Sequence, residues 1–246
     1  MALVYLIVVR LSRRAMEPVV QSVQRQKQFI TDAGHELKTP ITVIATSLRL
    51  LEMEVGQQKW LEKAQNQAER LKELVNSLVT LSRMDEEESP LKLSDFAVSE
   101  AVEETAESFR DFARSQGHPL ELAIVPGLTY CGDQYAVRQL VSILLDNAVK
   151  YAPQGTDIRL TLTHQDRTAC LAVENGGDPI PPEVAAHLFD RFYRADSSRT
   201  GTGFGLGLAI ARAIVQNHRG NIICRSQEGL NRFSVTLPIL RQKEAQ

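Results

Sequence analysis

The amino-acid sequence predicts a two-part protein, in which a helical hairpin that pairs into a dimeric four-helix bundle precedes an α/β sandwich. Apolar residues within 19–81 recur at the spacing of coiled-coil helices. Beyond residue 90, helical and strand-like runs are mixed along the chain. An acidic run followed by Pro90 separates the two patterns and is typical of a linker. We therefore predict one domain over residues 19–88 and a second over residues 91–240.

The composition is that of an ordinary globular protein, with 43% apolar and 24% charged residues in a chain of 246. The formal net charge of −2 gives no electrostatic support for a nucleic-acid partner. Cys131, Cys170 and Cys224 are far apart and form no C-x-x-C pair. This spacing argues against a disulfide scaffold or a zinc site and fits a reducing compartment.

The N-terminal segment, residues 1–18, combines an apolar run with a basic flank. Met1–Val9 carries no charge, and Arg10, Arg13 and Arg14 follow it. A membrane-spanning helix needs about 20 apolar residues, so this run is too short to cross by itself. The basic flank is typical of the cytoplasmic end of a transmembrane helix. We interpret the segment as the truncated end of such a helix and expect the chain at the cytoplasmic face of the membrane; a short surface helix or a truncated signal-peptide core are the alternatives.

Two long amphipathic helices are predicted for residues 19–88. In the first helix, Ile30, Leu37, Ile44 and Leu51 lie seven residues apart, and Ile41, Leu48 and Val55 interleave with them. After Gly56, the apolar positions of the second helix alternate steps of three and four: Leu61, Ala64, Ala68, Leu71, Val75 and Leu78. A hairpin buries only one seam, and Leu74 and Leu81 widen the apolar face of the second helix. We expect a second copy of the hairpin to cover this face as a homodimer; packing on the rest of the same chain is the alternative.

The second part contains three helical stretches, at Ser99–Ser115, Gln134–Tyr151 and Phe204–Asn217. Its strand-like runs are shorter: Leu120–Val125, Asp157–Thr163, Ala169–Glu174, Asn221–Arg225 and Phe233–Leu237. Because helices and strands are mixed rather than strictly alternating, we predict an α+β sandwich with helices on one face of a sheet.

His35 lies on the first predicted helix, two residues before the seam position Leu37, and therefore faces solvent or a docking partner. Phosphoryl transfer needs a nucleophile that approaches the phosphorus in line, and a neutral imidazole suits this near pH 7. Glu36 can hold the proton of the other ring nitrogen, and Thr39 follows one turn later on the same face. Pro40 should bend the helix beside His35. Considered alone, such a histidine would be an ordinary surface residue.

The segment FITDAGHELKTP, residues 29–40, resembles the H-box of bacterial two-component sensor histidine kinases. Four later segments resemble the boxes of that family's ATP-binding domain, in the expected order: Leu144–Tyr151, Val173–Ile180, Leu188–Arg194 and Gly201–Ile210. The resemblance implies that ATP with Mg²⁺ phosphorylates His35, assisted by Glu36 as acid and base. It also implies phosphotransfer to an aspartate of a response-regulator protein, with Thr39 tied to phosphatase activity.

The first of these segments is similar to the N-box and lies on a predicted helix. Asn147 projects a neutral oxygen that suits magnesium bound mainly through phosphates. Lys150 can meet phosphate charge, and Tyr151 can cover the adenine ring. Ile143 stands where family members often carry a second Asn, so that among these positions magnesium contact rests on Asn147 alone.

The second segment is similar to the G1 box, which reads adenine. Asn175 stands where the family usually has Asp, and its carbonyl oxygen can accept the bond from the adenine amino group. Gly177 lets the backbone pass close to a flat base. Pro179 replaces the usual second glycine, so both departures bear on adenine affinity.

The last two segments are similar to the F-box and the G2 box. Arg191 and Arg194, together with Arg199, are candidates for γ-phosphate contact through their forked donors, and the sequence does not rank them. Glycines before an apolar helix expose backbone amides that bind phosphates, and they form a lid that can open and close. The implied nucleotide-binding residues of this lid are Gly203, Gly205, Leu206, Gly207 and Leu208.

Two other classes of function remain open. An ATP-driven clamp shares this nucleotide-binding fold, but such relatives lack the H-box hairpin. A catalytically degenerate adaptor or phosphatase-only protein would keep the shape without kinase activity, and Ile143, Asn175 and Pro179 are the residues that favour it. The stimulus and the identity of the regulator are not encoded in any pattern of the chain.

Overall fold

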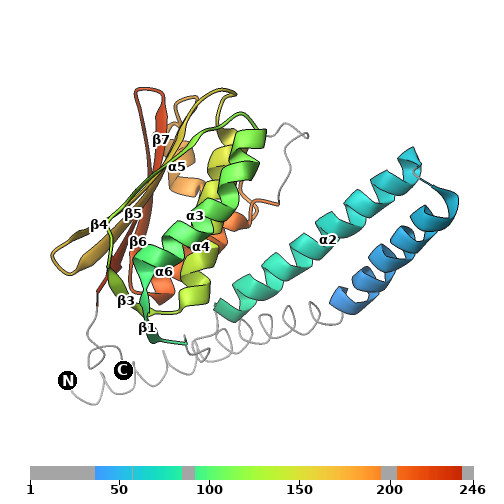
Figure 1. Ribbon diagram of the computed structural model, residues 1–246, viewed down its shortest axis with the longest axis horizontal. Coiled ribbons are helices and arrows are strands. Elements are labelled where there is room, and N and C mark those ends of the chain that lie inside the picture. Colours follow the sequence, from blue (N-terminus) through green and yellow to red (C-terminus); the bar gives the residue numbers. More distant parts are fainter. Residues whose placement is uncertain (1–36, 57, 85–91, 195–203, 240–246) are drawn as a thin grey trace, which may run out of the picture. The chain divides into compact units, whose positions relative to one another are not determined.

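The computed structural model describes residues 37–56, 58–84, 92–194 and 204–239. The chain divides into two compact units, Met1–Ser89 and Pro90–Gln246, which Figure 1 shows. His35 and Glu36 lie outside the described residues, as do residues 1–18. No helix in the described ranges is long and apolar enough to cross a membrane. The membrane association expected from residues 1–18 stays a prediction.

The described part of the first unit is a helical hairpin. Residues 37–55 form the first helix and α2, Lys59–Met84, forms the second. Gly56 ends the first helix with a φ of 74°, in the left-handed region that glycine adopts without steric cost. The amide of Gln65 joins the two helices, donating to the Glu52 carboxylate at 2.8 Å and to the Leu48 carbonyl at 3.4 Å. The predicted hairpin is therefore confirmed over these residues.

The apolar positions of the first helix divide into two sets. Ile41 is 3% exposed, whereas Leu37, Ile44, Leu51 and Val55 are each between 45% and 51% exposed. One set therefore packs within the hairpin, and the other is left on its outer surface. Single exposed apolar residues are common on protein surfaces and need no explanation. A contiguous row of them, as here, marks an interaction surface.

The second unit is built on a five-stranded sheet in the order β2-β4-β5-β7-β6. Its strands are β2 Leu120–Ile124, β4 Ile158–Gln165, β5 Thr168–Gly176, β6 Asn221–Gln227 and β7 Leu230–Pro238. β2 and β4 pair in parallel, and the other neighbours are antiparallel. A separate two-stranded sheet pairs β1, Ser94–Ala97, with β3, Thr129–Gly132.

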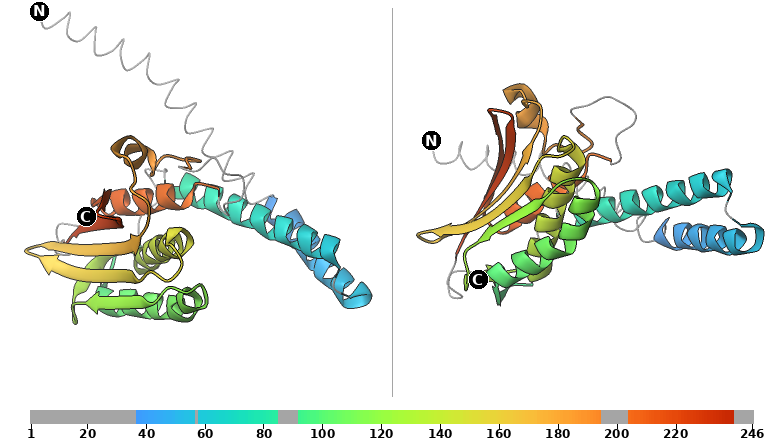
Figure 2. Two further views of the ribbon diagram at one scale, coloured as in Figure 1. Left: turned by 90° about the horizontal axis from the view of Figure 1, so that it is seen from above. Right: turned by 45° about the horizontal axis from the view of Figure 1, so that its top comes forward.

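Three helices cover one face of the large sheet, as Figures 1 and 2 show: α3 Val98–Ser115, α4 Gln134–Tyr151 and α6 Gly207–Asn217. The core lies between the two layers. On β4, Ile158, Leu160 and Leu162 alternate with more accessible residues, the period of a strand with one buried face. On α4, Leu140 and Leu144 are fully buried, at the spacing of one helical face. The predicted sandwich is confirmed.

Three short elements were not predicted: β1, β3 and α5, Pro182–His187. Each spans at most six residues, which is too short for a hydrophobic period to be visible. The prediction that the last helix begins at Phe204 was wrong, because α6 begins at Gly207. Gly205 has a φ of 70°, which is incompatible with a right-handed helix at that residue.

A buried histidine connects the ends of two helices in this unit. His218 follows α6, and its Nε2 accepts a hydrogen bond from the backbone N–H of Asp133 at 3.1 Å. Its Nδ1 lies 2.8 Å from the Ile214 carbonyl, which can only accept. The ring is therefore the neutral tautomer protonated on Nδ1. Asp133 caps α4 by accepting from Ala136 N–H, so the imidazole ties the end of α6 to the start of α4.

The burial of this imidazole makes stability depend on pH. Burial lowers the pKa of His218 below its ordinary value near 6.5. A depressed folded-state pKa gives stability that is complete above the unfolded pKa and is lost as pH falls through the folded one. We expect the free energy of unfolding, measured in urea between about pH 5 and pH 8, to fall at the acid end by about 1 kcal/mol more in wild type than in His218→Gln.

The exposed His164 on β4 supplies the matched control, and His164→Gln should keep the wild-type pH profile. An identical pH profile in wild type and His218→Gln would contradict this account of the buried ring.

Candidate functional site

One side of α4 carries the predicted N-box residues. Asn147 is half buried there, and Lys150 and Tyr151 are exposed at the last turn of the helix. Ile143 lies one turn before Asn147 on the same side, because residues four apart share a helical face. A Cβ added to Gly207 would lie 3.5 Å from Ile143 Cγ2, so the start of α6 packs against this side of α4.

The start of α6 presents backbone amides beside the Asn147 side of α4. Leu206 is buried and caps the helix, and its carbonyl accepts from Ile210 N–H at 2.9 Å. Gly207 and Leu208 are the first two residues of the helix, where N–H groups have no partner within the helix. Their amides and the helix dipole favour an anion.

A second segment holds the glycine stretch in place. Phe192 N–H donates to the Gly205 carbonyl at 3.0 Å, which joins the segment resembling the F-box to the segment resembling the G2 box. A Cβ on Gly205 would lie 2.6 Å from the Tyr193 carbonyl oxygen, so no side chain fits there. Arg191 and Arg194 are exposed on the same stretch of chain. Arg199 and Gly203 lie outside the described residues.

The predicted adenine-reading residues Asn175 and Gly177 lie at the end of β5 and directly after it. Asn175 near the end of β5 is 2% exposed, and its Nδ2 donates to the Gly176 carbonyl at 2.7 Å. Gly177 follows, and its N–H donates to the Gly229 carbonyl at 3.0 Å. A Cβ on Gly177 would lie 3.8 Å from the Tyr151 carbonyl oxygen, so this loop approaches the last turn of α4.

Asn231 lies beside Asn175 at this end of the site, and the sequence analysis did not predict it as a site residue. It pairs with Asn175 in the β5–β7 register and is 6% exposed. A signal was present: Asn231 extends backwards the alternating series of Phe233, Val235 and Leu237, all of which are buried on one face of β7. A polar residue at an apolar position of a strand is a candidate binding residue.

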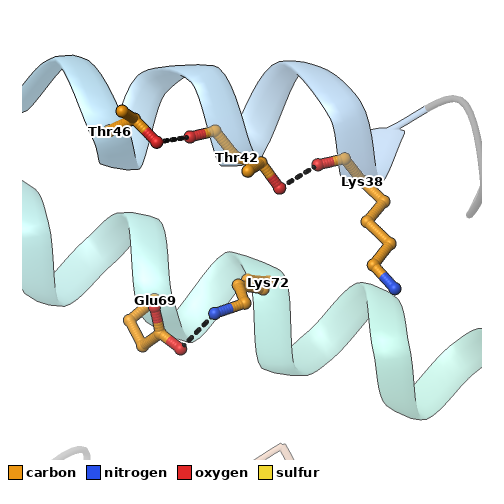
Figure 3. A network of polar contacts seen from close by, with 5 residues as sticks. All are labelled: Lys38, Thr42, Thr46, Glu69 and Lys72. Atoms are coloured by element: carbon orange, nitrogen blue, oxygen red, sulfur yellow. Dashed lines mark hydrogen bonds and ion pairs between the residues drawn. The ribbon is translucent and has the colours of Figure 1, made fainter.

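Thr39 is exposed on the first helix of the hairpin, and Pro40 lies inside that helix rather than ending it. Figure 3 shows the following turns, where the hydroxyls of Thr42 and Thr46 donate to the carbonyls of Lys38 and Thr42 at 2.8 and 2.9 Å. These two hydroxyls are engaged by their own helix. The bend expected beside His35 lies outside the described residues.

The side chains at this site could hold magnesium only together with the phosphates of a bound nucleotide. Across the described ranges, no group of three or more His, Cys, Asp or Glu side chains could hold a metal ion. Asn147 offers a single neutral oxygen, and Ile143 offers none. Such a site suits Mg²⁺, which keeps waters and is bound largely through the phosphates of its nucleotide.

A groove in the described part of the second unit lies elsewhere. It has a volume of about 630 Å³ and runs along the edge strand β6 beside α5 and α6. Its lining includes Phe189 and Arg212 but none of the predicted site residues. Ile180 and Phe189, which belong to the segments resembling the G1 box and the F-box, line this groove. The predicted nucleotide-binding residues that the structure describes lie on α4, at the start of α6, at the end of β5 and in residues 191–194.

The packing around Gly205 generates a stability prediction. Alanine at this position combines left-handed strain with a steric overlap against Tyr193, so Gly205→Ala should lower the free energy of unfolding by about 2–4 kcal/mol. Gly127→Ala is the matched control, because Gly127 has a φ of 72° and open space around its Cβ position. It should cost only about 1–2 kcal/mol in urea unfolding. Equal losses in the two variants would contradict the overlap.

Family models match both parts of the chain. The His Kinase A (phospho-acceptor) domain matches residues 25–87, and the histidine kinase-, DNA gyrase B-, and HSP90-like ATPase matches residues 132–241. Among solved structures, the Acinetobacter baumannii histidine kinase AdeS is 26% identical with a TM-score of 0.61, covering 84% of this chain and 98% of that one. Full-length ShkA in complex with AMPPNP, 24% identical, shares the fold with a TM-score of 0.75 over 86% of this chain and 45% of its own.

Curated relatives agree with these matches. Sensor protein DltS of Streptococcus agalactiae serotype III (strain NEM316) is 34% identical over 230 residues, which cover 93% of this chain and 58% of DltS. Sensor histidine kinase CusS of Escherichia coli (strain K12) is 34% identical over 221 residues, 87% of this chain and 46% of CusS. The chain thus spans about half the length of these relatives. The phosphoacceptor domain and the ATPase domain follow each other in the order that this family has. The chain therefore belongs to the sensor histidine kinases of bacterial two-component systems.

Proposed function

We propose that this chain transfers the γ-phosphoryl group of ATP to His35 and then to an aspartate of a response-regulator protein. The observation that carries the proposal is the packing of Gly207 against Ile143, which puts the amides at the start of α6 beside Asn147. This packing supports a phosphate site in the second unit, and the phosphoacceptor family model over residues 25–87 supports a phosphoacceptor helix in the first.

ATP fits the site along the last turns of α4. At one end, the buried Asn175 offers an amide oxygen to the adenine amino group, and the exposed Tyr151 can cover the base. At the other end, the amides of α6 and the exposed Lys150 provide positive charge for the phosphates. Arg191 and Arg194 are candidates for the γ-phosphate on the adjoining segment.

The chemistry assigned to the histidine follows from its ring. One imidazole nitrogen of His35 attacks the γ-phosphorus, the bond to the β–γ bridging oxygen breaks, and ADP leaves. The ring becomes cationic, and Glu36 would stabilise that charge and accept the proton of the other ring nitrogen. Magnesium, held by the nucleotide phosphates and Asn147, would offset the charge on the phosphoryl oxygens.

The onward partner is proposed from chemistry and from a structural relative. A phosphohistidine can pass its group to a carboxylate. Thr39 follows His35 by four residues in the sequence, one helical turn, and would orient a water in the reverse, phosphatase reaction. ThkA, which shares this fold at 21% identity and a TM-score of 0.63, is known in complex with the response regulator protein TrrA. This supports a response regulator as the class of partner.

The half-exposed face of the hairpin supports a homodimer. Leu37, Ile44 and Leu51 recur every seven residues, and Val55 follows Leu51 by one turn. Together they form an apolar stripe that the hairpin itself does not cover. A second copy of the same hairpin offers a matching stripe, which would complete a four-helix bundle by two-fold symmetry.

A non-kinase alternative is favoured by one observation. Ile143 occupies the side of α4 that faces Gly207, where an amide would otherwise help to hold the phosphate end of the nucleotide. With Asn175 in place of a carboxylate, the chain would then act as an adaptor or a phosphatase only.

Phosphate labelling decides between these functions. The purified chain, incubated with γ-labelled ATP and Mg²⁺, should acquire label that is labile in acid and stable in base, because a phosphoramidate forms on imidazole. His35→Ala should abolish the label. Thr46→Ala is the control on the first helix and should label at the wild-type rate, because the Thr46 hydroxyl is engaged by the Thr42 carbonyl of its own helix.

ATP hydrolysis without retained label would indicate a clamp, and neither labelling nor hydrolysis would indicate an adaptor. Label that persisted in His35→Ala would exclude His35 as the phosphoacceptor.

The dimer is tested at the exposed stripe. Ile44→Asp combined with Leu51→Asp buries two charges at the proposed interface, and an unpaired buried charge costs about 3 kcal/mol or more. We expect the dimer dissociation constant, measured by light scattering after size exclusion, to rise at least about 100-fold. Met53→Asp is the control, because Met53 is 82% exposed and lies off the stripe. An unchanged dimer in the double variant, or a monomeric wild type, would refute this interface.

A further inference from the structure

β6 is an edge strand of the large sheet, and its outer side is open. The strand order leaves β6 with one neighbour, β7. Every second residue of such a strand directs its backbone N–H and C=O away from that neighbour. Among the residues that the structure describes, no backbone group of another strand or loop bonds to this outer side. These groups are therefore available to an additional strand.

The groove of about 630 Å³ follows this edge for the whole length of the strand. All of β6, Asn221–Gln227, lines it. The opposite wall is apolar and comes from the loop after β5 and from α5 and its end: Ile180, Ala185, Ala186 and Phe189. Phe189 is fixed in this wall, because its ring packs edge-on against Phe233 of β7 with 6.4 Å between the ring centroids. An extended peptide could thus bond to β6 and lie against apolar side chains at once.

The two faces of β6 differ in what they would offer to such a peptide. Ile222 and Cys224 face the helix layer, since their register partners Val235 and Phe233 are buried in the core. Arg225 follows Cys224 and therefore points to the other face, where it is exposed. A strand added to β6 would alternate in the same way. One row of its side chains would meet the apolar wall, and the other row would lie beside Arg225.

The charged side chains of the groove are cationic. Arg212 of α6 and Arg225 line it, and no Asp or Glu of the described chain does. Arg225 makes none of the ion pairs or hydrogen bonds found among the described residues. Arg212 lies 3.9 Å from Asp190 Oδ1, and the carboxylate of Asp190 is also bonded to His187 Nδ1 at 2.7 Å. The groove therefore carries an uncompensated positive charge at Arg225 and a partly compensated one at Arg212.

We propose that the β6 edge binds an extended segment of a partner protein in which apolar residues alternate with Asp or Glu, and that this segment adds a sixth strand to the sheet. Backbone hydrogen bonds to β6 supply the affinity, and the apolar side chains pack beside Phe189. The acidic side chains face Arg225 and select the partner by charge. This surface is separate from the nucleotide site, so the proposal does not rest on the binding of ATP.

The competing explanation is that Arg225 only protects the edge. A charge on an edge strand discourages pairing with other chains. Such an arginine would oppose an added strand of any charge, so acidic and basic peptides would both fail to bind. The two explanations therefore differ in a measurable preference.

Peptide titration of the full chain, followed by amide hydrogen exchange, tests the proposal. The probe is a capped octapeptide of alternating valine and glutamate, and the matched control has lysine in place of glutamate. The acidic peptide should slow exchange at the outward amides of β6. It should leave β2, the other edge of the same sheet, unchanged. The lysine peptide should bind at least about tenfold more weakly.

Two further changes separate the charge from the backbone. Arg225→Glu should weaken the acidic peptide about fivefold at low salt and less at high salt, and it should strengthen the lysine peptide. Arg114→Glu, the same charge change on α3 outside the groove, is the matched control and should keep both affinities. The acidic peptide with its backbone N–H groups methylated keeps its side chains but loses its donors, and it should not bind.

Equal binding of the acidic and lysine peptides, retained binding of the methylated peptide, or unchanged exchange in β6 would overturn the proposal. Outward β6 amides that already exchange slowly in the free chain would show that the chain covers its own edge, and would overturn it as well. Protection of β6 that rises with protein concentration alone would assign the edge to a second copy instead. If Arg225→Glu does not fold, the peptide series decides the question.

Discussion

The contact between α4 and the first residue of α6 is the constraint on which the site depends. Gly207 has no side chain and lies against Ile143, so the amides at the start of α6 open beside Asn147. The fully buried Leu140 and Leu144 fix α4 on the sheet, and His218 ties the end of α6 to the cap of α4. The two helices are therefore joined to each other at two places, at Gly207 with Ile143 and at His218 with Asp133. The geometry of the proposed phosphate site would therefore follow from core packing rather than from the glycine stretch alone.

The hairpin shows a different use of apolar surface. The second unit closes its core within one chain, because a sheet face and three helices cover each other. The hairpin has only two helices, and Ile41 is buried between them while Ile44 and Leu51 stay half exposed. A phosphoacceptor helix must remain accessible on one side, so its stability has to come from the opposite side. A symmetric partner meets this requirement without covering the solvent side.

Much of this architecture could be predicted from the sequence, because long periodic segments carry a strong signal. The helices at Gln134–Tyr151 and the hairpin were predicted from apolar spacing alone. The start of α6 was not predicted correctly. The apolar spacing of the helix extends back to Phe204, but the left-handed backbone of Gly205 excludes a helix there. Asn231 was missed because its role depends on strand register, which pairs it with a residue more than fifty positions earlier. The roles of the site residues, including those of His35 and Glu36, remain predictions.

Amide hydrogen exchange with and without AMPPNP and Mg²⁺ tests the central claim most directly. The account predicts that nucleotide slows exchange at the first amides of α6 and in the loop after β5, because both would contact the ligand. Residues of β6 along the separate groove should exchange as before. Protection confined to that groove, or no protection at the start of α6, would contradict the assignment of the phosphate site to the junction of α4 and α6.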